Sequence, residues 1–164
     1  MEENTDSLQA RKKALRLLER MDRTEKGLSD RLRQAGFSDE AVLDALAYVK
    51  SCGYLDDMRY AENYLRNHLN GDSKKKLMYD LRRKGISEEC ALKAWEEIIR
   101  EETCEPYDET GQILKILAGR YADADLEDPA QKRRVCGFLA RRGFLWEDIM
   151  AALDIHGKSC KIYD

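Results

Sequence analysis

The sequence predicts an all-α protein built from three tandem three-helix repeats. Two observations carry this prediction: the amino-acid composition, and a segment that occurs three times. The 164 residues include only two prolines and ten glycines, while 37% are charged and 43% are hydrophobic. Glu, Lys, Arg, Leu and Ala are abundant, which favours helices over sheets or disorder, and the apolar share is sufficient for packed cores.

A segment of sixteen residues occurs three times without a gap, at 31–46, 80–95 and 138–153. One glycine takes the same place in each copy, and the three are 49 and 58 residues apart: Gly36, Gly85 and Gly143. Glycine adopts a left-handed backbone at little cost, so each is predicted to end a helix. The apolar residue that follows is predicted to fill the corner between two helices: Phe37, Ile86 and Phe144.

The first repeat is predicted at 7–56, with helices at 7–21, 24–35 and 38–52. Leucines mark the apolar side of the first helix: Leu15, Leu17 and Leu18. Ser38 is the predicted N-cap of the third helix. That helix shows the apolar spacing of an amphipathic helix, through Val42, Leu43, Leu46 and Val49.

The second repeat is predicted at 57–104, with helices at 57–70, 73–84 and 87–102. Its first helix has an apolar side formed by Tyr60, Ala61, Tyr64 and Leu65. The two tyrosines are therefore predicted to be core residues. Ser87 is the predicted N-cap of the third helix, and Trp95 lies on the apolar side of that helix.

The third repeat is predicted at 105–155, with helices at 108–121, 129–142 and 146–153, followed by a tail at 156–164. Glu105-Pro106 marks the boundary with the second repeat, because a residue before proline resists the α conformation. Asp128-Pro129 supplies an N-cap and a proline at the first helical position. Leu145-Trp146 is a weaker helix start, and Trp146, beside Glu147, can lie exposed at a contact surface.

The charge is small in total but strongly patterned. The formal net charge is −3, whereas residues 11–33, 74–84 and 131–142 each sum to +5 and residues 88–128 sum to −9. A protein that coats DNA generically needs many cations against phosphates, so this class is disfavoured. The pattern predicts one face that meets an anion and another that repels it.

The sequence shows no catalytic or cofactor-binding constellation. His68 and His156 lie in different repeats, and Gly157-Lys158-Ser159 lacks the first glycine and the preceding strand of a phosphate loop. No residue is assigned to catalysis, to a cofactor or to a metal. We expect a protein that is not an enzyme.

The compartment is expected to be the cytoplasm, with no membrane association. The first residues show neither the basic nor the apolar region of a leader, and no run of about 18 apolar residues occurs. Five cysteines are spread without a C-x-x-C pair. They are interpreted as small buried side chains except Cys160, which is expected to be exposed.

Two motifs resemble those of the RecX regulatory proteins. Gly53-Tyr54-Leu55-Asp56-Asp57-Met58-Arg59-Tyr60-Ala61 is similar to the family's G-Y-[LI]-[DN]-D-x-x-[FY]-A signature, and Leu81-Arg82-Arg83-Lys84-Gly85-Ile86 resembles the L-x-x-K-G-[IV] that follows it. Leu139-Ala-Arg-Arg-Gly143-Phe144 resembles the last repeat of the family, so the resemblance covers about residues 10–155.

The resemblance implies an elongated, curved array of helical repeats that lies in the groove of the RecA–DNA filament. It also implies a regulator of DNA repair, recombination and the SOS response, which mainly inhibits RecA ATP hydrolysis, strand exchange and coprotease activity. Family members are often basic overall, and this chain is acidic. Its affinity for free DNA is therefore in doubt, while contact with DNA inside the filament stays open.

A helical wheel predicts a basic face on two helices. Leu77 and Leu81 mark the buried side of 73–84, and the opposite side gathers Lys75, Lys76, Tyr79, Arg82 and Arg83. A shift of 58 residues places a second basic set on 129–142, formed by Arg133, Arg134 and Arg141. These eight residues are the predicted partner-binding residues. The alternative is that such charged faces are merely solvated.

Two other classes of function fit a three-helix repeat. A nucleic-acid-binding module could place a recognition helix in DNA, but the expected recognition helix of the second repeat is acidic, through Glu88, Glu89, Glu96, Glu97, Glu101 and Glu102. A helical-repeat scaffold for another protein fits the architecture equally well and loses only on the motif. A monomer is the expected oligomeric state.

Overall fold

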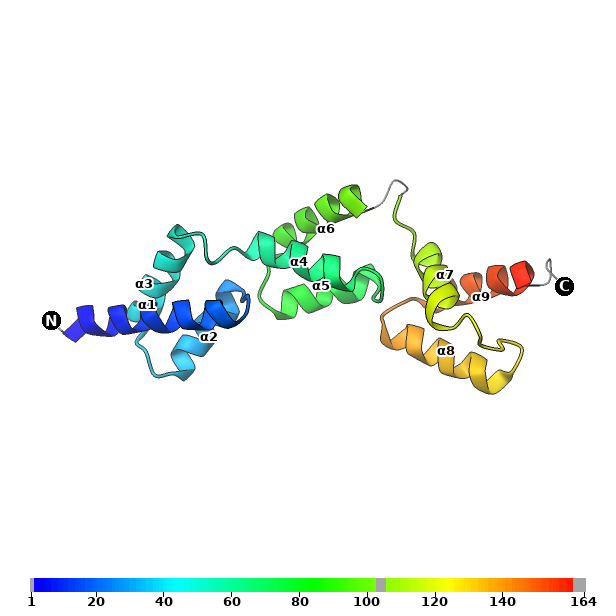
Figure 1. Ribbon diagram of the computed structural model, residues 1–164, viewed down its shortest axis with the longest axis horizontal. Coiled ribbons are helices and arrows are strands. Elements are labelled where there is room, and N and C mark those ends of the chain that lie inside the picture. Colours follow the sequence, from blue (N-terminus) through cyan, green and yellow to red (C-terminus); the bar gives the residue numbers. More distant parts are fainter. Residues whose placement is uncertain (1, 103–105, 161–164) are drawn as a thin grey trace. The chain divides into compact units, whose positions relative to one another are not determined.

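The structure, a computed structural model, describes the backbone of residues 2–102 and 106–160 and the side chains of residues 5–102 and 106–159. These residues form nine helices and no strand (Figure 1). The helices are α1 Glu2–Arg20, α2 Glu25–Gln34, α3 Asp39–Ser51, α4 Asp57–His68, α5 Lys74–Arg83, α6 Glu88–Glu102, α7 Glu109–Arg120, α8 Pro129–Arg141 and α9 Trp146–Cys160. The all-α prediction is confirmed.

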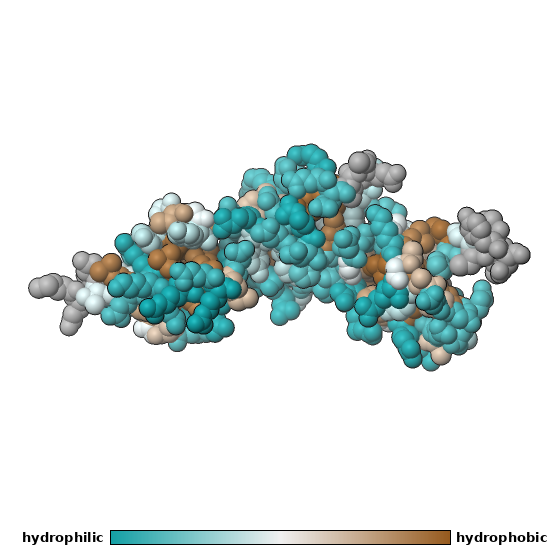
Figure 2. Space-filling view, viewed as in Figure 1, coloured by the Kyte–Doolittle hydropathy of each residue, from teal (hydrophilic) through white to brown (hydrophobic). Residues whose placement is uncertain are grey.

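The chain divides into two compact units. Residues up to Tyr64 together with Asp80–Trp95 form the first unit, and Leu65–Tyr79 together with the residues from Glu96 onward form the second. The division passes through α4, α5 and α6. Hydrophilic side chains cover much of the surface that is in view, and apolar side chains show between the helices of each unit (Figure 2).

Each unit has its own apolar core. In the first, α1, α2 and α3 pack around Ala14, Leu28, Leu32 and Val42, which are all fully buried. In the second, α7, α8 and α9 pack around Ile113, Leu117, Leu139 and Ile149, which are also fully buried. Burial of these aliphatic side chains provides the main stabilising free energy.

The three repeat glycines end their helices as predicted. Gly36, Gly85 and Gly143 have φ angles of 90°, 89° and 86°. At Gly85 the peptide N–H donates to the carbonyl of Arg82 at 3.0 Å, and the N–H of Ile86 donates to the carbonyl of Leu81 at 3.0 Å. These two bonds form a Schellman motif, and the same pair recurs at Gly36 and Gly143.

Gly53 ends α3 in the same way, which the repeat alignment did not predict. Its φ is 75°, and the N–H of Tyr54 donates to the carbonyl of Val49 at 3.0 Å. Leu55 follows and is 3% exposed. The first residues of the RecX-like motif therefore terminate one helix and anchor the connector to the core.

The predicted N-caps are confirmed. The hydroxyls of Ser38 and Ser87 accept hydrogen bonds from the N–H groups of Ala41 at 3.3 Å and Cys90 at 3.2 Å. The carboxylate of Asp128 accepts one from Ala130 at 3.1 Å, with Pro129 at the first helical position. Each bond satisfies an N–H that has no partner within its helix.

Four predictions from the apolar pattern are wrong or incomplete. Leu43 is 62% and Leu92 is 41% exposed, because both lie at the solvent edge of the apolar stripe. Cys52 is exposed at the C-cap of α3, while Cys136 is buried and Cys90 is half-buried. Cys104 and the side chain of Cys160 lie outside the described residues. Helix α9 continues to Cys160 rather than ending at 153. Gly157 is the strongest helix-breaking residue in the added segment, and it lowers helix propensity without ending the helix.

The aromatic side chains follow the prediction in part. Trp95 is 5% exposed and belongs to the core. Tyr60 and Tyr64 are half-buried instead, and the ammonium of Lys84 lies over both rings, 5.9 Å and 5.3 Å from their centroids. Cation–π attraction holds the aliphatic stem of this lysine against α4.

A joint between successive repeats is built twice from the same parts. In the first unit, the Thr24 hydroxyl accepts from the N–H of Gly27 at 3.0 Å and donates to the carbonyl of Lys84 at 2.6 Å. The carboxylate of Asp57 accepts from the N–H of Glu25 at 2.8 Å. The start of α2 is thus capped by Thr24 and by Asp57 at the start of α4, and the Thr24 hydroxyl is tied to the end of α5.

The second unit repeats this arrangement 49 residues later. The Ser73 hydroxyl accepts from the N–H of Lys76 at 3.1 Å, and its own N–H donates to the carbonyl of Arg142 at 2.9 Å. The carboxylate of Glu109 accepts from the N–H of Lys74 at 3.0 Å. The start of α5 is therefore capped by the end of α8 and the start of α7.

Candidate interaction surface

Helix α5 presents the predicted basic face. Leu77 and Leu81 are fully buried, which fixes the orientation of the helix. Lys75, Arg82 and Arg83 are exposed, and Tyr79 is 59% exposed. Lys75 and Tyr79 belong to the second compact unit, and Arg82 and Arg83 to the first. The wheel thus assigned these four side chains to the solvent side correctly.

Lys76 differs from its neighbours because it is held by a buried carboxylate. Its ammonium lies 3.1 Å from Oδ2 of Asp72, and Nη1 of Arg142 lies 3.2 Å from Oδ1 of the same group. The side chain of Asp72 is only 3% exposed, so it requires cationic partners. The prediction that Lys76 lies opposite the buried side needs correction, since this lysine is half-buried and paired within the protein.

Local sequence spacing predicts one contact of this ion triad and not the other. Asp72 and Lys76 are four residues apart, a spacing at which side chains on a helical turn meet. Arg142 is 70 residues from Asp72, and no local pattern predicts their contact. The guanidinium of Arg142 also lies 5.0 Å from the ring centroid of Phe138, which orients it toward the carboxylate.

Helix α8 presents the second predicted set. Val135, Cys136 and Leu139 face the core, and the three predicted arginines are exposed: Arg133, Arg134 and Arg141. No acidic residue occurs between 131 and 142, so this face carries positive charge without internal compensation. Arginine engages carboxylates and phosphates through two parallel hydrogen bonds, which suits either kind of anionic partner.

An apolar groove runs beside the basic residues of α8. It has a volume of about 450 Å³ and lies between α8 and the start of α9. Its lining residues are Pro129, Lys132, Arg133, Cys136, Gly137, Ala140, Trp146 and Met150. Trp146 is 61% exposed, as its place at the start of α9 allowed. Sequence reasoning missed Lys132 and Met150, which join the groove only through the packing of α8 on α9.

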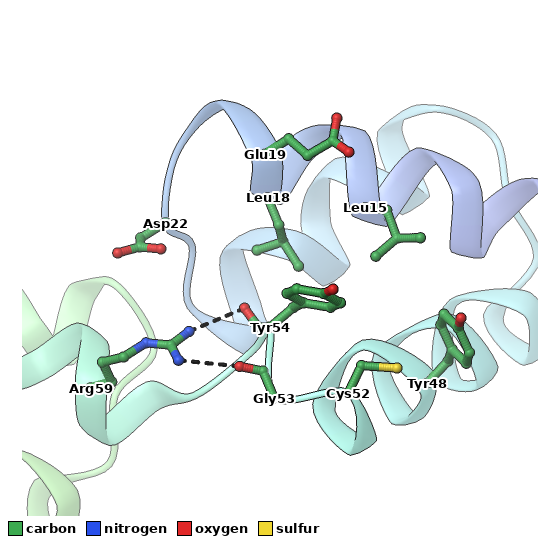
Figure 3. A pocket seen from close by; sticks show the side chains of 9 residues that line it. All are labelled: Leu15, Leu18, Glu19, Asp22, Tyr48, Cys52, Gly53, Tyr54 and Arg59. Carbon is green, nitrogen blue, oxygen red and sulfur yellow. Dashed lines mark hydrogen bonds between the residues drawn. The ribbon is translucent and has the colours of Figure 1, made fainter.

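A second hollow, of about 730 Å³, lies in the first unit between α1 and the connector from α3 to α4 (Figure 3). Leu15 and Leu18 line it on one side, and the rings of Tyr48 and Tyr54 line it on the other. The guanidinium of Arg59 donates to the carbonyl of Gly53 at 3.1 Å and to that of Tyr54 at 3.4 Å. Arg59 therefore fixes the connector.

Burial perturbs the carboxylates of both joints. Removal from water is the largest effect on Asp57 and raises its pKa, against the lowering effect of its hydrogen bond from the N–H of Glu25. Burial also raises the pKa of Glu109, against the lowering effect of its hydrogen bond from Lys74. These groups serve as acceptors for helix N–H groups, which accounts for their positions.

The described residues contain no cluster of three or more His, Cys, Asp or Glu side chains that could hold a metal ion. Over the same part of the chain, none of the helices combines the length and apolar character needed to cross a bilayer. What the surface offers chemically is exposed guanidinium and ammonium groups beside an apolar groove. Such an arrangement suits recognition of an anionic macromolecule.

Comparisons with known proteins agree with this architecture. Three family models match in order: the first three-helix domain of RecX at residues 10–48, the second at 56–94 and the third at 107–153. The described fold places the chain among the helical-repeat proteins. By these matches and the relatives below, it belongs to the RecX family.

The relatives are regulatory proteins of the same name. The regulatory protein RecX of Trichlorobacter lovleyi is 36% identical over 135 residues, which cover 80% of this chain and 84% of that protein. The RecX of Clostridium perfringens strain 13 is 32% identical over 114 residues, or 70% of this chain. The chain spans only 51% of the length of that relative and 64% of the RecX of Clostridium tetani.

Solved structures share the fold. The crystal structure of RecX from Lactobacillus salivarius matches with a TM-score of 0.65 at 21% identity, covering 92% of this chain and 96% of that one. A second RecX crystal structure matches with a TM-score of 0.67 at 21% identity, covering 91% and 73%.

Proposed function

We propose that this chain regulates RecA by binding the RecA–DNA filament. Its main effect is inhibition of RecA ATP hydrolysis, strand exchange and coprotease activity, in DNA repair and recombination. The observation that carries the proposal is the ordered match of three RecX domains along residues 10–153. The names of the relatives support a regulatory role.

The charge distribution supports a filament as the partner rather than bare DNA. The net charge is −3, while exposed cations form short faces on α5 and α8. The surface of a protein filament on DNA carries carboxylates close to phosphates. Short basic faces can bind such anions at a few positions. The proposed binding residues are Lys75, Tyr79, Arg82, Arg83, Arg133, Arg134 and Arg141, with Lys76 contributing through its pairing with Asp72.

In this proposal the chain acts by binding alone, and it does so as a cytoplasmic monomer. Its site needs only exposed guanidinium and ammonium groups, which recognise anions without chemical change in either partner. Contact with DNA inside the filament is compatible with the same groups, because phosphates and carboxylates both accept from arginine.

The test measures ATP hydrolysis by RecA of the same organism on single-stranded DNA, with increasing amounts of the purified chain. The expected result is a dose-dependent fall in the hydrolysis rate, with the chain sedimenting with the filaments. A parallel titration of free single-stranded DNA separates the two partner classes. The proposal is wrong if the chain binds free DNA as tightly as it binds filaments. It is also wrong if the chain binds neither free DNA nor filaments and leaves the rate of RecA ATP hydrolysis unchanged.

A further inference from the structure

We infer that the apolar groove between α8 and α9 is an anchor site for an acidic protein segment that carries a large apolar side chain. The inference deepens the proposed function and rests on it for the partner, because the segment is taken to belong to a RecA protomer in the filament. The basic faces described above supply charge recognition. The groove adds a place where a side chain of the partner becomes buried.

The groove has the shape and lining of an anchor site. Cys136, Gly137 and Ala140 of α8 are small, and they leave a hollow of about 450 Å³ that Trp146 and Met150 of α9 wall. This is within the range of cavities that hold a ligand or an anchoring side chain. Interfaces derive most of their binding free energy from such apolar pockets and from exposed aromatic side chains, above all tryptophan.

Trp146 puts a large apolar side chain at an exposed helix-start position that Asp39 and Glu88 occupy in the other repeats. Trp95, the other tryptophan, is 5% exposed, whereas Trp146 is 61% exposed and its neighbour Leu145 is 55% exposed. A large aromatic side chain left in water at a helix start costs hydrophobic free energy that partner binding would recover. This makes Trp146 the expected centre of the contact.

Charge on the rim selects the occupant. Lys132 and Arg133 line the groove, no acidic residue lines it, and neither cation has an ion-pair partner among the described residues. The nearby carboxylate of Asp128 is used to cap α8, accepting from Ala130 at 3.1 Å. An apolar floor with a cationic rim is complementary to an apolar side chain flanked by carboxylates. A nucleic acid would match the rim but would leave the floor without an apolar partner.

The test fills the groove without removing a charged side chain. A Cβ on Gly137 would meet only the flexible end of Arg141, at 3.3 Å, so Gly137→Leu is expected to fold and to occupy the hollow. Gly119→Leu is the matched control, because Gly119 is also helical and a Cβ there meets nothing within 4 Å. Both variants replace a helical glycine, so neither should lower the melting temperature. Trp146→Ala removes the wall.

Binding of each full-length variant to RecA filaments on single-stranded DNA is measured by sedimentation and by inhibition of ATP hydrolysis. The inference expects Gly137→Leu and Trp146→Ala to weaken binding about tenfold or more, while Gly119→Leu matches wild type. Lys132→Gln with Arg133→Gln should weaken binding at low salt and less at high salt, because salt screens the rim charges.

The outcomes separate the groove from the proposed function. If Gly137→Leu and Trp146→Ala inhibit RecA as strongly as wild type does, the inference about the groove is wrong and the proposed function still stands. If the wild-type protein does not bind filaments, both the inference and the proposed function are wrong. Loss of binding to free single-stranded DNA, with filament binding intact, would show that a nucleic acid occupies the groove and would contradict the inference.

Discussion

At the residue scale, the motifs that resemble the RecX family are mostly structural. Gly53 adopts a φ of 75° that ends α3, Leu55 is buried, and Ala61 is fully buried on α4. Asp57 accepts the first N–H of α2, and the carboxylate of Asp56 accepts from the N–H of Arg59 at 3.1 Å. The Gly53–Ala61 motif therefore specifies a joint between repeats.

Gly143→Ala should destabilise the protein more than Gly36→Ala. Both positions have a left-handed backbone, which costs an alanine about 1–2 kcal/mol. A Cβ at 143 would also lie 2.5 Å from the Ser73 hydroxyl and 2.8 Å from Cβ of Lys76, whereas one at 36 meets nothing within 4 Å. We expect losses of about 1 kcal/mol at 36 and at least about twice that at 143, measured by urea denaturation. Equal losses would mean that the second joint is not packed as described.

The joint carboxylate makes a prediction about pH. Burial raises the pKa of Asp57, so the folded state holds this proton more tightly than the unfolded state does. Its contribution to stability is therefore present below the ordinary aspartate pKa and is lost as the pH rises through the raised value. Asp57→Asn keeps an acceptor for the N–H of Glu25 and removes the buried charge. The free energy of unfolding at neutral pH should rise by about 0.5 kcal/mol, with little difference from wild type at pH 3.

Asp57→Ala is the control for this prediction, because it removes the acceptor along with the charge. It should cost about 1 kcal/mol at neutral pH, as loss of a helix N-cap does. If the asparagine and alanine variants are equally unstable, then the charge of Asp57, rather than its acceptor oxygen, stabilises the joint.

At the scale of the element, α5 and α8 have two roles on opposite faces. Leu77 and Leu81 of α5, and Val135 and Leu139 of α8, are buried and hold the helices in place. The other faces carry exposed cations, among them Lys75 and Arg82 of α5 and Arg133, Arg134 and Arg141 of α8. Substitutions on those faces should therefore separate binding from stability.

Replacing Arg82 and Arg83 with alanine, and in a second variant Arg134 and Arg141, should weaken inhibition of RecA. Each position is exposed, so the cost in stability should be about 0.5 kcal/mol or less per site. Each lost charge-assisted contact is worth about 1.5–3 kcal/mol where it is desolvated. Inhibition constants measured across a salt titration check this, and the two doubles compare α5 with α8.

The matched control for the basic doubles is Glu88→Ala with Glu96→Ala on α6. Both glutamates are exposed and form no ion pair within the described residues, unlike Glu97, which pairs with Arg100 at 3.0 Å, and Glu101, which pairs with Arg66 at 3.0 Å. The control should inhibit RecA as wild type does. Inhibition that survives in both basic doubles and is lost in the control would identify the acidic surface as the one that docks.

At the scale of the whole molecule, hydrogen bonds within each compact unit connect successive repeats. Thr24 and Ser73 cap the second helix of their own repeat, and Asp57 and Glu109 of the next repeat accept its first N–H. The joints make each repeat depend on its neighbour for satisfied helix ends. A chain built this way offers a series of helical surfaces.

The purified chain alone should hydrolyse no nucleotide and cut no nucleic acid. The expectation follows because the proposed binding groups are exposed guanidinium and ammonium groups. Among the described residues, no nucleophile–base pair is associated with them. Phosphate release from ATP and cleavage of labelled DNA, each with added magnesium, are the measurements. Turnover that copurifies with the chain through several columns would contradict the assignment to a binding role.

The sequence by itself determined the helices and most of the places where they begin and end. A glycine in the left-handed region and a serine or aspartate at a helix start act through hydrogen bonds within a few residues, so Gly36, Gly85, Gly143, Ser38 and Asp128 could be assigned correctly. The solvent-facing arginines of α5 and α8 were likewise predictable, because a helix has a fixed period of about 3.6 residues per turn.

Only the tertiary structure decided which of those residues meet others far along the chain. Asp72 takes Arg142 from 70 residues away, Thr24 takes the carbonyl of Lys84 from 60 residues away, and Lys76 is consequently part of an ion triad rather than an open cation. The groove beside Trp146 exists because α9 packs on α8 at small residues. Such contacts depend on how helices pack against one another, and helical periodicity alone carries no record of the partner that each face will meet.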